Sequence, residues 1–319
     1  MAAFPRGPGR PDRRPLICAA QNTPNSSKVN ESANLVEIHS LVVLGDVRRV
    51  KLSTSHDLAE DLGMRLLSAA AIALIGLSAP VAAQDLCVGY GPQTPRDISS
   101  HAGVNSRLFA AAPPASKMNL CNIHTHTNAE HRGPEFSVFA GAGVNGGYQC
   151  DASGLTDAQL ENVDGAFKGA RAGETIEVHW VHTSCDVAPG EGLGACLSDA
   201  CANPQLRVEA QVFLVVNDES ADDFSDYAYR GEAVGGLHQA KAFPYGGTPV
   251  EFAGSTTGPS YDQATCSPLQ VTWSVRPKCR LLDQSSLHAW AEKNPFNETK
   301  SHGVRSLVTA PELLSPISN

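Results

Sequence analysis

The chain has 319 residues, of which 42% are hydrophobic and 18% are charged, and its formal net charge at pH 7 is −9. Because an acidic chain is repelled by phosphates, the composition argues against a nucleic-acid partner and favours a small or neutral substrate. The length allows one or two domains.

A secretory signal peptide is predicted at residues 64–83. Met64 and Arg65 form a short basic start, an apolar run continues to Leu77, and small residues lead to the predicted cleavage site. The alternative is an uncleaved membrane anchor, but the run is short for a span of about 20 residues. We therefore expect a periplasmic or secreted protein without stable membrane insertion, and we interpret residues 1–63 as an upstream extension outside the fold.

Eight of the nine cysteines follow the predicted cleavage site, and an even number in an exported chain predicts a disulfide framework. The spacing does not choose among the possible pairings. A thiolate metal site is the weaker alternative, because the sequence has no CxxC pair and exported thiols tend to oxidise. The eight are Cys87, Cys121, Cys150, Cys185, Cys196, Cys201, Cys266 and Cys279.

Short apolar segments separated by Gly and Pro dominate the rest of the chain, which predicts a mainly β class with few short helices. Residues 84–117 are rich in Gly, Pro and Ser and predict a surface arm. Helices are predicted at 155–167, where Thr156 or Asp157 can cap the first turn, and at 285–293. The predicted strands are residues 118–125, 136–139, 175–183, 206–216, the first part of 251–259, and 269–275.

Two predicted strands carry histidines at a metal-binding spacing. In CNIHTHTNAEHRGPEF, His124 and His126 are two residues apart, so both side chains point to one face of a strand. In TIEVHWVHTSC, apolar residues alternate with Glu177 and His179. If these strands are neighbours, three neutral imidazoles meet and leave a fourth position open, which is the usual arrangement of catalytic zinc.

The remaining histidines are less well placed. His131 lies in the polar turn AEHRG and is the alternative third ligand, whereas His182 faces away from His179 and is predicted to pack or form a hydrogen bond. Because ligand histidines usually donate their second N–H to a carboxylate or carbonyl, Glu177 is predicted to orient His179. The histidines predicted on the surface are His101, His238, His288 and His302.

Sequence motifs of competing chemistries are absent. The serines lack a GxSxG setting, no HExxH pattern indicates a metalloprotease, and no Gly-rich loop opens a helix to hold phosphate.

Taken together, these segments resemble the delta-class carbonic anhydrases, with a fainter similarity to the alpha class. The alpha class has an HxH strand, an S-E-H turn, an E-x-H-x-x-H-W strand and a late G-S-L-T-T-P-P segment before V-T-W. The counterparts here are HTH, then AEH at 129–131, EVHWVH at 177–182, GSTTGP at 254–259 and VTW at 271–273. The resemblance covers roughly residues 121–275.

The resemblance implies a zinc-dependent carbonic anhydrase, which hydrates carbon dioxide reversibly to bicarbonate and a proton through a zinc-bound hydroxide. It implies Zn²⁺ held by His124, His126 and His179. It also implies one domain at residues 84–319, with a core at about 118–280 built on a central, mostly antiparallel twisted sheet.

The resemblance further implies roles for groups beside the ligands. Thr256 is expected to accept the hydroxide proton and to be held by Glu130, while Thr257 lines the pocket and Glu177 and His131 support the ligands. Two features depart from the alpha class, since no leucine precedes the two threonines and a glycine replaces the proline after them. No histidine matches a proton-shuttle motif.

Two other functions stay open at this point. A non-catalytic periplasmic zinc-binding protein would use the same histidines with a closed fourth position, taking His131 or a carboxylate as the fourth ligand. A secreted binding module would have structural disulfides and incidental histidines. For the enzyme, the expected small-molecule partner is carbon dioxide or bicarbonate, and the sequence does not indicate an oligomeric state.

Overall fold

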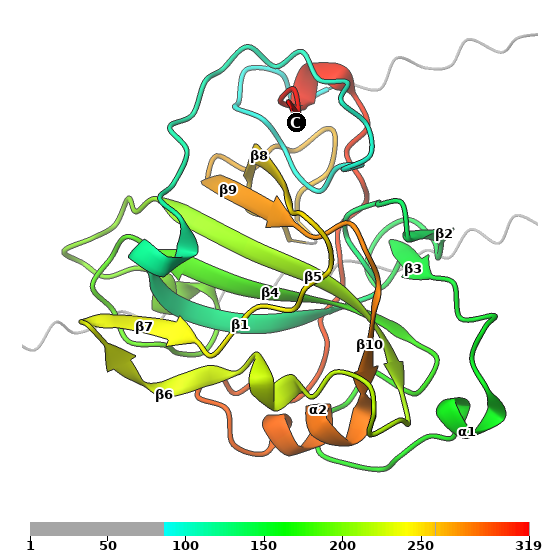
Figure 1. Cartoon of the computed structure of the whole chain (residues 1–319). Helices are drawn as coiled ribbons and strands as arrows, with labels where there is room; N and C mark the ends of the chain where they lie inside the picture. The colour runs from blue at the N-terminus through cyan, green and yellow to red at the C-terminus, as the bar shows by residue number, and fades with distance from the viewer. Residues whose placement is uncertain (1–85, 259, 319) are drawn as a thin grey trace, which may run out of the picture. The chain divides into compact units, whose positions relative to one another are not determined.

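A six-stranded mixed sheet is the main element of the fold. The computed structural model describes residues 86–258 and 260–318. The strands of the sheet are β1 (Asn119–Thr127), β4 (Thr175–Thr183), β5 (Leu206–Val216), β8 (Val250–Ser255), β9 (Gln270–Val275) and β10 (Arg280–Asp283). Their order is β1-β4-β5-β9-β8, with β10 also paired to β5 (Figure 1).

Most neighbouring strands of this sheet run antiparallel. The antiparallel pairs are β1 with β4, β4 with β5, and β8 with β9, whereas β9 and β10 both pair with β5 in parallel. The predicted mainly β class with a mostly antiparallel central sheet is therefore confirmed.

β5 is central because it is long and has neighbours along both edges. Its 11 residues pair with β9 through 207–210 and with β10 through 213–216, so both parallel strands share one of its edges. Ala210 packs in a core cluster on one face and Phe213 in a second cluster on the other. Its first half alternates apolar residues with the buried polar residues Arg207, Glu209 and Gln211, whereas residues 212–216 are apolar throughout, as expected where a strand is buried by apolar neighbours on both faces.

The predicted strand positions agree closely with the structure. Residues 175–183 and 206–216 form strands over those same residues, and β1, β8 and β9 begin within a residue of their predicted starts. Two small sheets are added by β2 (Phe136–Phe139) with β3 (Tyr148–Cys150), and β6 (Tyr229–Val234) with β7 (Leu237–Ala240). β6 escapes prediction because nearly all of it is exposed, so its sequence carries no apolar pattern.

The predicted helix at 155–167 is wrong beyond its first turn. α1 covers only Asp157–Leu160, and a capping box between Thr156 and Gln159 begins it. The chain then turns inward, since a Cβ at Gly165 would lie 2.2 Å from the ring of His288. Packing against that ring, rather than helix propensity, decides the path of the segment.

α2 (Gln284–Ala291) confirms the second predicted helix, and Asp283 caps it by accepting a hydrogen bond from the Ser286 amide. His288, predicted on the surface, is instead buried on this helix and bonds Val163 and Phe167 through its two ring nitrogens. The described 3₁₀ helices are η1 (Ala115–Lys117), η2 (Leu193–Cys196), η3 (Phe224–Asp226) and η4 (Pro311–Leu313).

Four disulfides confirm the predicted framework. They use all eight cysteines that follow the predicted cleavage site, and they tie segments 16 to 179 residues apart in the sequence. A crosslink that closes a long loop stabilises a fold chiefly by restricting the unfolded chain. The pairs are Cys87–Cys266, Cys121–Cys196, Cys150–Cys279 and Cys185–Cys201.

The arm before β1 is buried in its middle, which corrects the prediction of a surface arm. Gln93, Thr94 and Arg96 are each at most 1% exposed. The Arg96 guanidinium donates to three backbone carbonyls, among them that of Ser315 near the C-terminus. The polar residues that make the arm resemble a surface segment therefore find their partners inside the protein.

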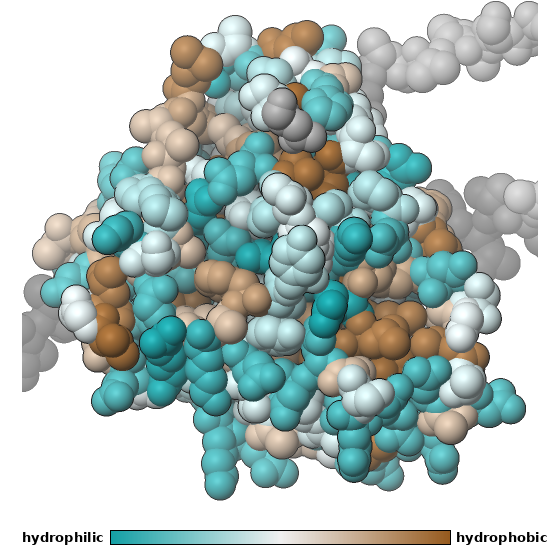
Figure 2. All heavy atoms as spheres, in the orientation of Figure 1, coloured by the Kyte–Doolittle hydropathy of each residue, from teal (hydrophilic) through white to brown (hydrophobic). Residues whose placement is uncertain are grey.

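The surface of the described part is mixed in polarity. Figure 2 shows polar and apolar residues interspersed on the face seen in Figure 1, with the apolar residues in separate patches. None of the helices in residues 86–258 and 260–318 has the length and apolarity needed to cross a membrane. The predicted signal peptide and upstream extension lie outside the described residues.

Candidate metal centre

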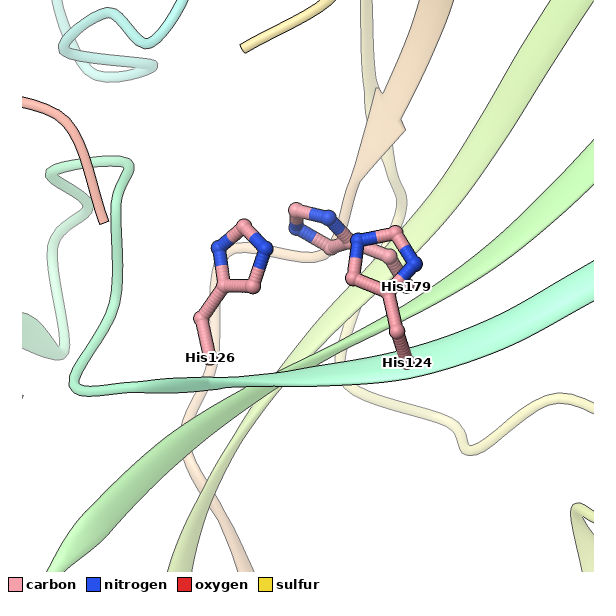
Figure 3. A group of neighbouring side chains, drawn as sticks. All are labelled: His124, His126 and His179. Atoms are coloured by element: carbon pink, nitrogen blue, oxygen red, sulfur yellow. The ribbon is translucent and has the colours of Figure 1, made fainter. Parts of the chain in front are cut away.

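Three histidines from two neighbouring strands converge on one point. His124 of β1 is directly opposite His179 of β4 in the strand register, and His126 follows two residues later. The ring centroids are 5.0 Å apart for His124 and His126, 5.1 Å for His124 and His179, and 4.6 Å for His126 and His179. One nitrogen of each ring lies within 4.8 Å of the other two, and Figure 3 shows the rings gathered on one side of the strands.

Strand alternation places these side chains together. Along β4, Ile176, Val178 and Trp180 pack in the core cluster on one face, so Glu177 and His179 point to the opposite face. Residues two apart on a strand share a face, and this alternation both predicts the grouping of the histidines and produces it in the structure.

On β1, each imidazole has one nitrogen beside a polar partner. Nδ1 of His124 lies 2.7 Å from Oδ1 of Asn122, and Nδ1 of His126 lies 3.3 Å from Oε2 of Glu130. Asn122 is absent from the sequence prediction, although its position two residues before His124 on the same strand face could have indicated it. The Nε2 atoms of both histidines have no hydrogen-bond partner among the described residues.

In His179 the two ring nitrogens have the opposite roles, with Nε2 beside a polar group and Nδ1 without a partner. Its Nε2 lies 3.3 Å from Oε1 of Glu177, as the sequence predicts, and its Nδ1 has no hydrogen-bond partner in the described part of the chain. A histidine that ligates a metal usually donates its other N–H to a carboxylate, carbonyl or water. The donor set therefore fits a metal ion held by three imidazoles.

Burial and neighbouring charges shift the protonation of these groups. Burial, reinforced by the adjacent imidazoles, holds the pKa of His124 well below its ordinary value and lowers the pKa of His179. Burial also lowers the pKa of His126, but the Glu130 carboxylate outweighs it and the net direction is upward. Burial raises the pKa of Glu130, yet the surrounding imidazoles, His126 above all, bring it down to about 2.

His131, the alternative third ligand, has both ring nitrogens engaged. Its Nδ1 lies 2.8 Å from Oε1 of Glu177, and its Nε2 lies 3.2 Å from Oγ1 of Thr94. Glu130, His131 and His179 also have ligand atoms within 4.8 Å of one another. Because His131 would have to give up a buried hydrogen bond to ligate, the three-histidine group is the better metal site.

The expected hydrogen bond between Glu130 and Thr256 is not formed. Oγ1 of Thr257 instead donates to Oε1 of Glu130 over 3.2 Å, whereas Oγ1 of Thr256 lies 3.0 Å from Oγ of Ser267. β8 ends at Ser255, and side chains that follow in an extended chain alternate in direction. Without the alpha-class leucine, the second residue after that serine is Thr257, so it takes the position predicted for Thr256.

A pocket of about 420 Å³ opens over the histidines. Its walls include His124, His126, Glu130 and Thr257, so two of the three histidines border a space that a small molecule can enter. Thr256 instead lines a separate pocket of about 430 Å³ that contains none of the three histidines.

The C-terminal segment forms one side of the histidine pocket. His302, predicted as an ordinary surface histidine, is half exposed there, with its ring centroid 6.4 Å from that of His124. Its Nε2 lies 2.9 Å from Oε2 of Glu298, whose Oε1 accepts hydrogen bonds from the amide and hydroxyl of Thr125. The sequence contains no local signal for this placement, since more than 170 residues separate Glu298 from Thr125.

A buried centre of three histidines on adjacent antiparallel strands defines a candidate metalloprotein of the mainly β class. The family described as Delta carbonic anhydrase matches residues 115–286, more than half of the chain, and the chain belongs to that family. A search of curated proteins finds no match. The matched segment contains the three histidines, Glu130 and Thr257, but neither the buried arm nor His302.

Proposed function

We propose that this protein is a zinc-dependent carbonic anhydrase that hydrates carbon dioxide reversibly to bicarbonate and a proton. The observation that carries the proposal is the group formed by His124, His126 and His179, whose ligand atoms lie within 4.8 Å of one another beside a pocket lined by His124 and His126. Membership of the delta carbonic anhydrase family supports the same activity.

The three imidazoles would hold Zn²⁺, for which nitrogen ligands and a tetrahedral geometry with one open position are typical of catalytic sites. When bound, zinc lowers the pKa of a coordinated water to about 7 and so supplies a nucleophile at neutral pH. The pocket over His124 and His126 leaves room for that open position and for the substrate.

Thr257 would orient the nucleophile. Its hydroxyl donates its own proton to Oε1 of the buried Glu130 carboxylate. Because the Thr257 hydroxyl has used its proton, its oxygen can only accept a hydrogen bond from a group in the pocket. It would therefore select a nucleophile whose oxygen carries a proton. That hydrogen bond would direct a lone pair of the nucleophile at the carbon of carbon dioxide. Thr256, which faces elsewhere, would take no part in this step.

Glu177 would fix the orientation of His179. The Glu177 carboxylate accepts from the ring of His131 and from the amide of Glu130, and its Oε1 lies 3.3 Å from Nε2 of His179. Burial raises the pKa of Glu177, but the imidazoles of His131 and His179 outweigh it and hold the pKa well below its ordinary value. A carboxylate fixed in this way would keep Nδ1 of His179 free for the metal.

The same proposal includes export. Four disulfides are compatible with an oxidising compartment. We infer that residues 64–83 direct the chain to the periplasm or outside the cell and that residues 84–319 act as one domain.

The test is stopped-flow hydration of carbon dioxide by the purified, zinc-loaded protein, beside His179→Ala and a matched histidine control, His238→Ala on β7. Wild type and control are expected to hydrate carbon dioxide well above buffer, and His179→Ala is expected to lose the activity. One bound zinc without hydration would favour the non-catalytic zinc-binding protein. Loss of all metal on dialysis of wild type would favour the binding module.

A further inference from the structure

Thr94 lies at the end of a buried chain of polar contacts that leads to the candidate ligand His179. Its Oγ1 is 3.2 Å from Nε2 of His131, whose Nδ1 is 2.8 Å from Oε1 of Glu177, and both contacts are hydrogen bonds. The same carboxylate oxygen lies 3.3 Å from Nε2 of His179, a close contact that does not have hydrogen-bond geometry. All four residues are at most 1% exposed, so water does not compete for these contacts.

The donors along this chain follow from the acceptor at its centre. A carboxylate accepts only, so His131 must present Nδ1–H to Glu177, and the same oxygen, 3.3 Å from Nε2 of His179, favours a proton on that nitrogen. Nε2 of neutral His131 is then an acceptor, and the Thr94 hydroxyl is the group that can donate to it. Without that hydroxyl only Glu177 would favour this tautomer, and Nε2 of His131 would be left buried without a donor, which weakens the preference for Nδ1–H.

The position of Thr94 is built into the fold rather than left to a mobile arm. Its backbone amide donates to Oγ of Ser255 over 3.4 Å. The residue before Ser255 is Gly254, and a Cβ at this position would lie 3.1 Å from the Cβ of Thr94. The absence of a side chain on Gly254 therefore permits the close approach of Thr94. Beside it, Gln93 accepts from the Ser267 amide and from the Ser255 hydroxyl.

We propose that Thr94 is a positioning residue of the metal centre, acting through His131 and Glu177 to hold His179 as a ligand. This role lies outside residues 115–286, the segment that matches the family. The inference rests on the proposed zinc function, because it takes His179 as a zinc ligand.

The experiment compares Thr94→Val, which keeps the side-chain shape but removes the hydroxyl, with Thr94→Ser, which keeps the hydroxyl. Zinc affinity is measured by competition with a chromophoric chelator, and ring ¹⁵N chemical shifts of the zinc-free protein report the His131 tautomer. Removing groups that orient metal ligands typically costs 10–100-fold in affinity, and for this more distant group we expect about 10-fold in Thr94→Val. We also expect a mixture of His131 tautomers in Thr94→Val and near wild-type behaviour in Thr94→Ser.

Two further variants separate this role from a general loss of stability. Ile98→Val removes one buried methyl from the same arm without touching the hydrogen-bond chain, and it should keep wild-type affinity and a single tautomer. If Thr94→Val does not fold, Thr94→Ala replaces it, because it also lacks the hydroxyl and adds no bulk.

The outcomes distinguish this inference from the proposed function. If His179→Ala loses zinc but the hydroxyl-free variant keeps both affinity and tautomer, Thr94 has no positioning role and the zinc site stands. If Thr94→Ser and Ile98→Val weaken zinc as much as Thr94→Val, the effect is structural and the inference is overturned. If His179→Ala binds zinc as wild type does, the proposed site itself is wrong.

Discussion

The strands β1 and β4 and the two segments that flank the family-matched region contribute to the pocket in different ways. β1 and β4 supply all three candidate ligands, and their residues belong to the family-matched part of the chain. The arm before β1 and the segment after α2 supply Thr94, Glu298 and His302, which touch the ligands or the groups behind them. The strands carry the candidate ligands, and the flanking segments border the pocket and contact groups next to the ligands.

The two groups of residues differ in how far apart their contacts are in the sequence. Neighbours on a strand face are two residues apart, so His124 and His126 are placed together by backbone geometry alone. The contact of Thr94 with Ser255 spans 161 residues, and that of Thr125 with Glu298 spans 173. Contacts of this kind form only when the sheet is complete, because ordering a long loop costs entropy that local contacts do not offset.

The largest effect should come from removing a strand histidine. His124→Ala should lose bound zinc after dialysis, with a drop in affinity beyond the roughly 10–100-fold typical of groups that only support a ligand. His302→Ala on the flank should retain one zinc per chain. Metal analysis of dialysed protein checks both, and equal loss of zinc in the two variants would mean that the flank supplies a ligand.

The next effect separates the two adjacent threonines. Thr257→Val should lower kcat/KM for carbon dioxide hydration by about 100-fold, since removing one oriented polar contact to a reacting oxygen typically costs about that much. Thr256→Val should stay within a few-fold of wild type, because its hydroxyl bonds Ser267 in another pocket. The reverse order would restore the role predicted for Thr256 from the sequence.

A smaller effect concerns His182, which β4 presents to the core rather than to the pocket. Burial lowers the pKa of His182 from its ordinary 6.5 to about 4. Between these values the unfolded chain takes up a proton that the folded chain does not, so stability falls as the pH drops from 6.5 toward 4. At pH 4.5 this linkage amounts to roughly 2–3 kcal/mol.

The measurement is urea unfolding of zinc-free wild type and His182→Gln at pH 7 and pH 4.5. The variant should lose less stability between the two pH values, because the titrating imidazole is gone while the other groups are common to both proteins. Parallel losses in the two proteins would show that His182 does not carry this dependence.

The smallest effect tests the contact between strand and flank. Gly254→Ala places a methyl 2.9 Å from Cδ1 of Trp273 and 3.1 Å from Cβ of Thr94. Overpacking of this kind costs about 1–3 kcal/mol. In the control, Gly154→Ala, the added methyl meets nothing within 4 Å, so its stability should match wild type. Thermal unfolding of both variants checks the difference. Equal stability would mean that the arm shifts to accommodate the methyl without a loss of folding free energy.

The class, the main strands and the grouping of the three histidines could be predicted from the sequence. Each of these depends on a repeat of two residues or on a continuous apolar run, and both are properties of neighbouring residues. The disulfide framework could also be predicted from an even number of cysteines, although not its pairing. The helix at 155–167 failed because its propensity was overruled by packing of Gly165 against His288.

The threonine that bonds Glu130, the pairing of the cysteines and the positions of the flanking segments could be seen only in the folded structure. The threonine depends on the residue at which β8 ends, and Thr94 and His302 reach the site only through contacts with distant strands. Such contacts are selected by shape and by the need of buried polar groups for partners. Neither shape complementarity nor the pairing of buried polar groups produces a periodic pattern in the sequence near the residues involved.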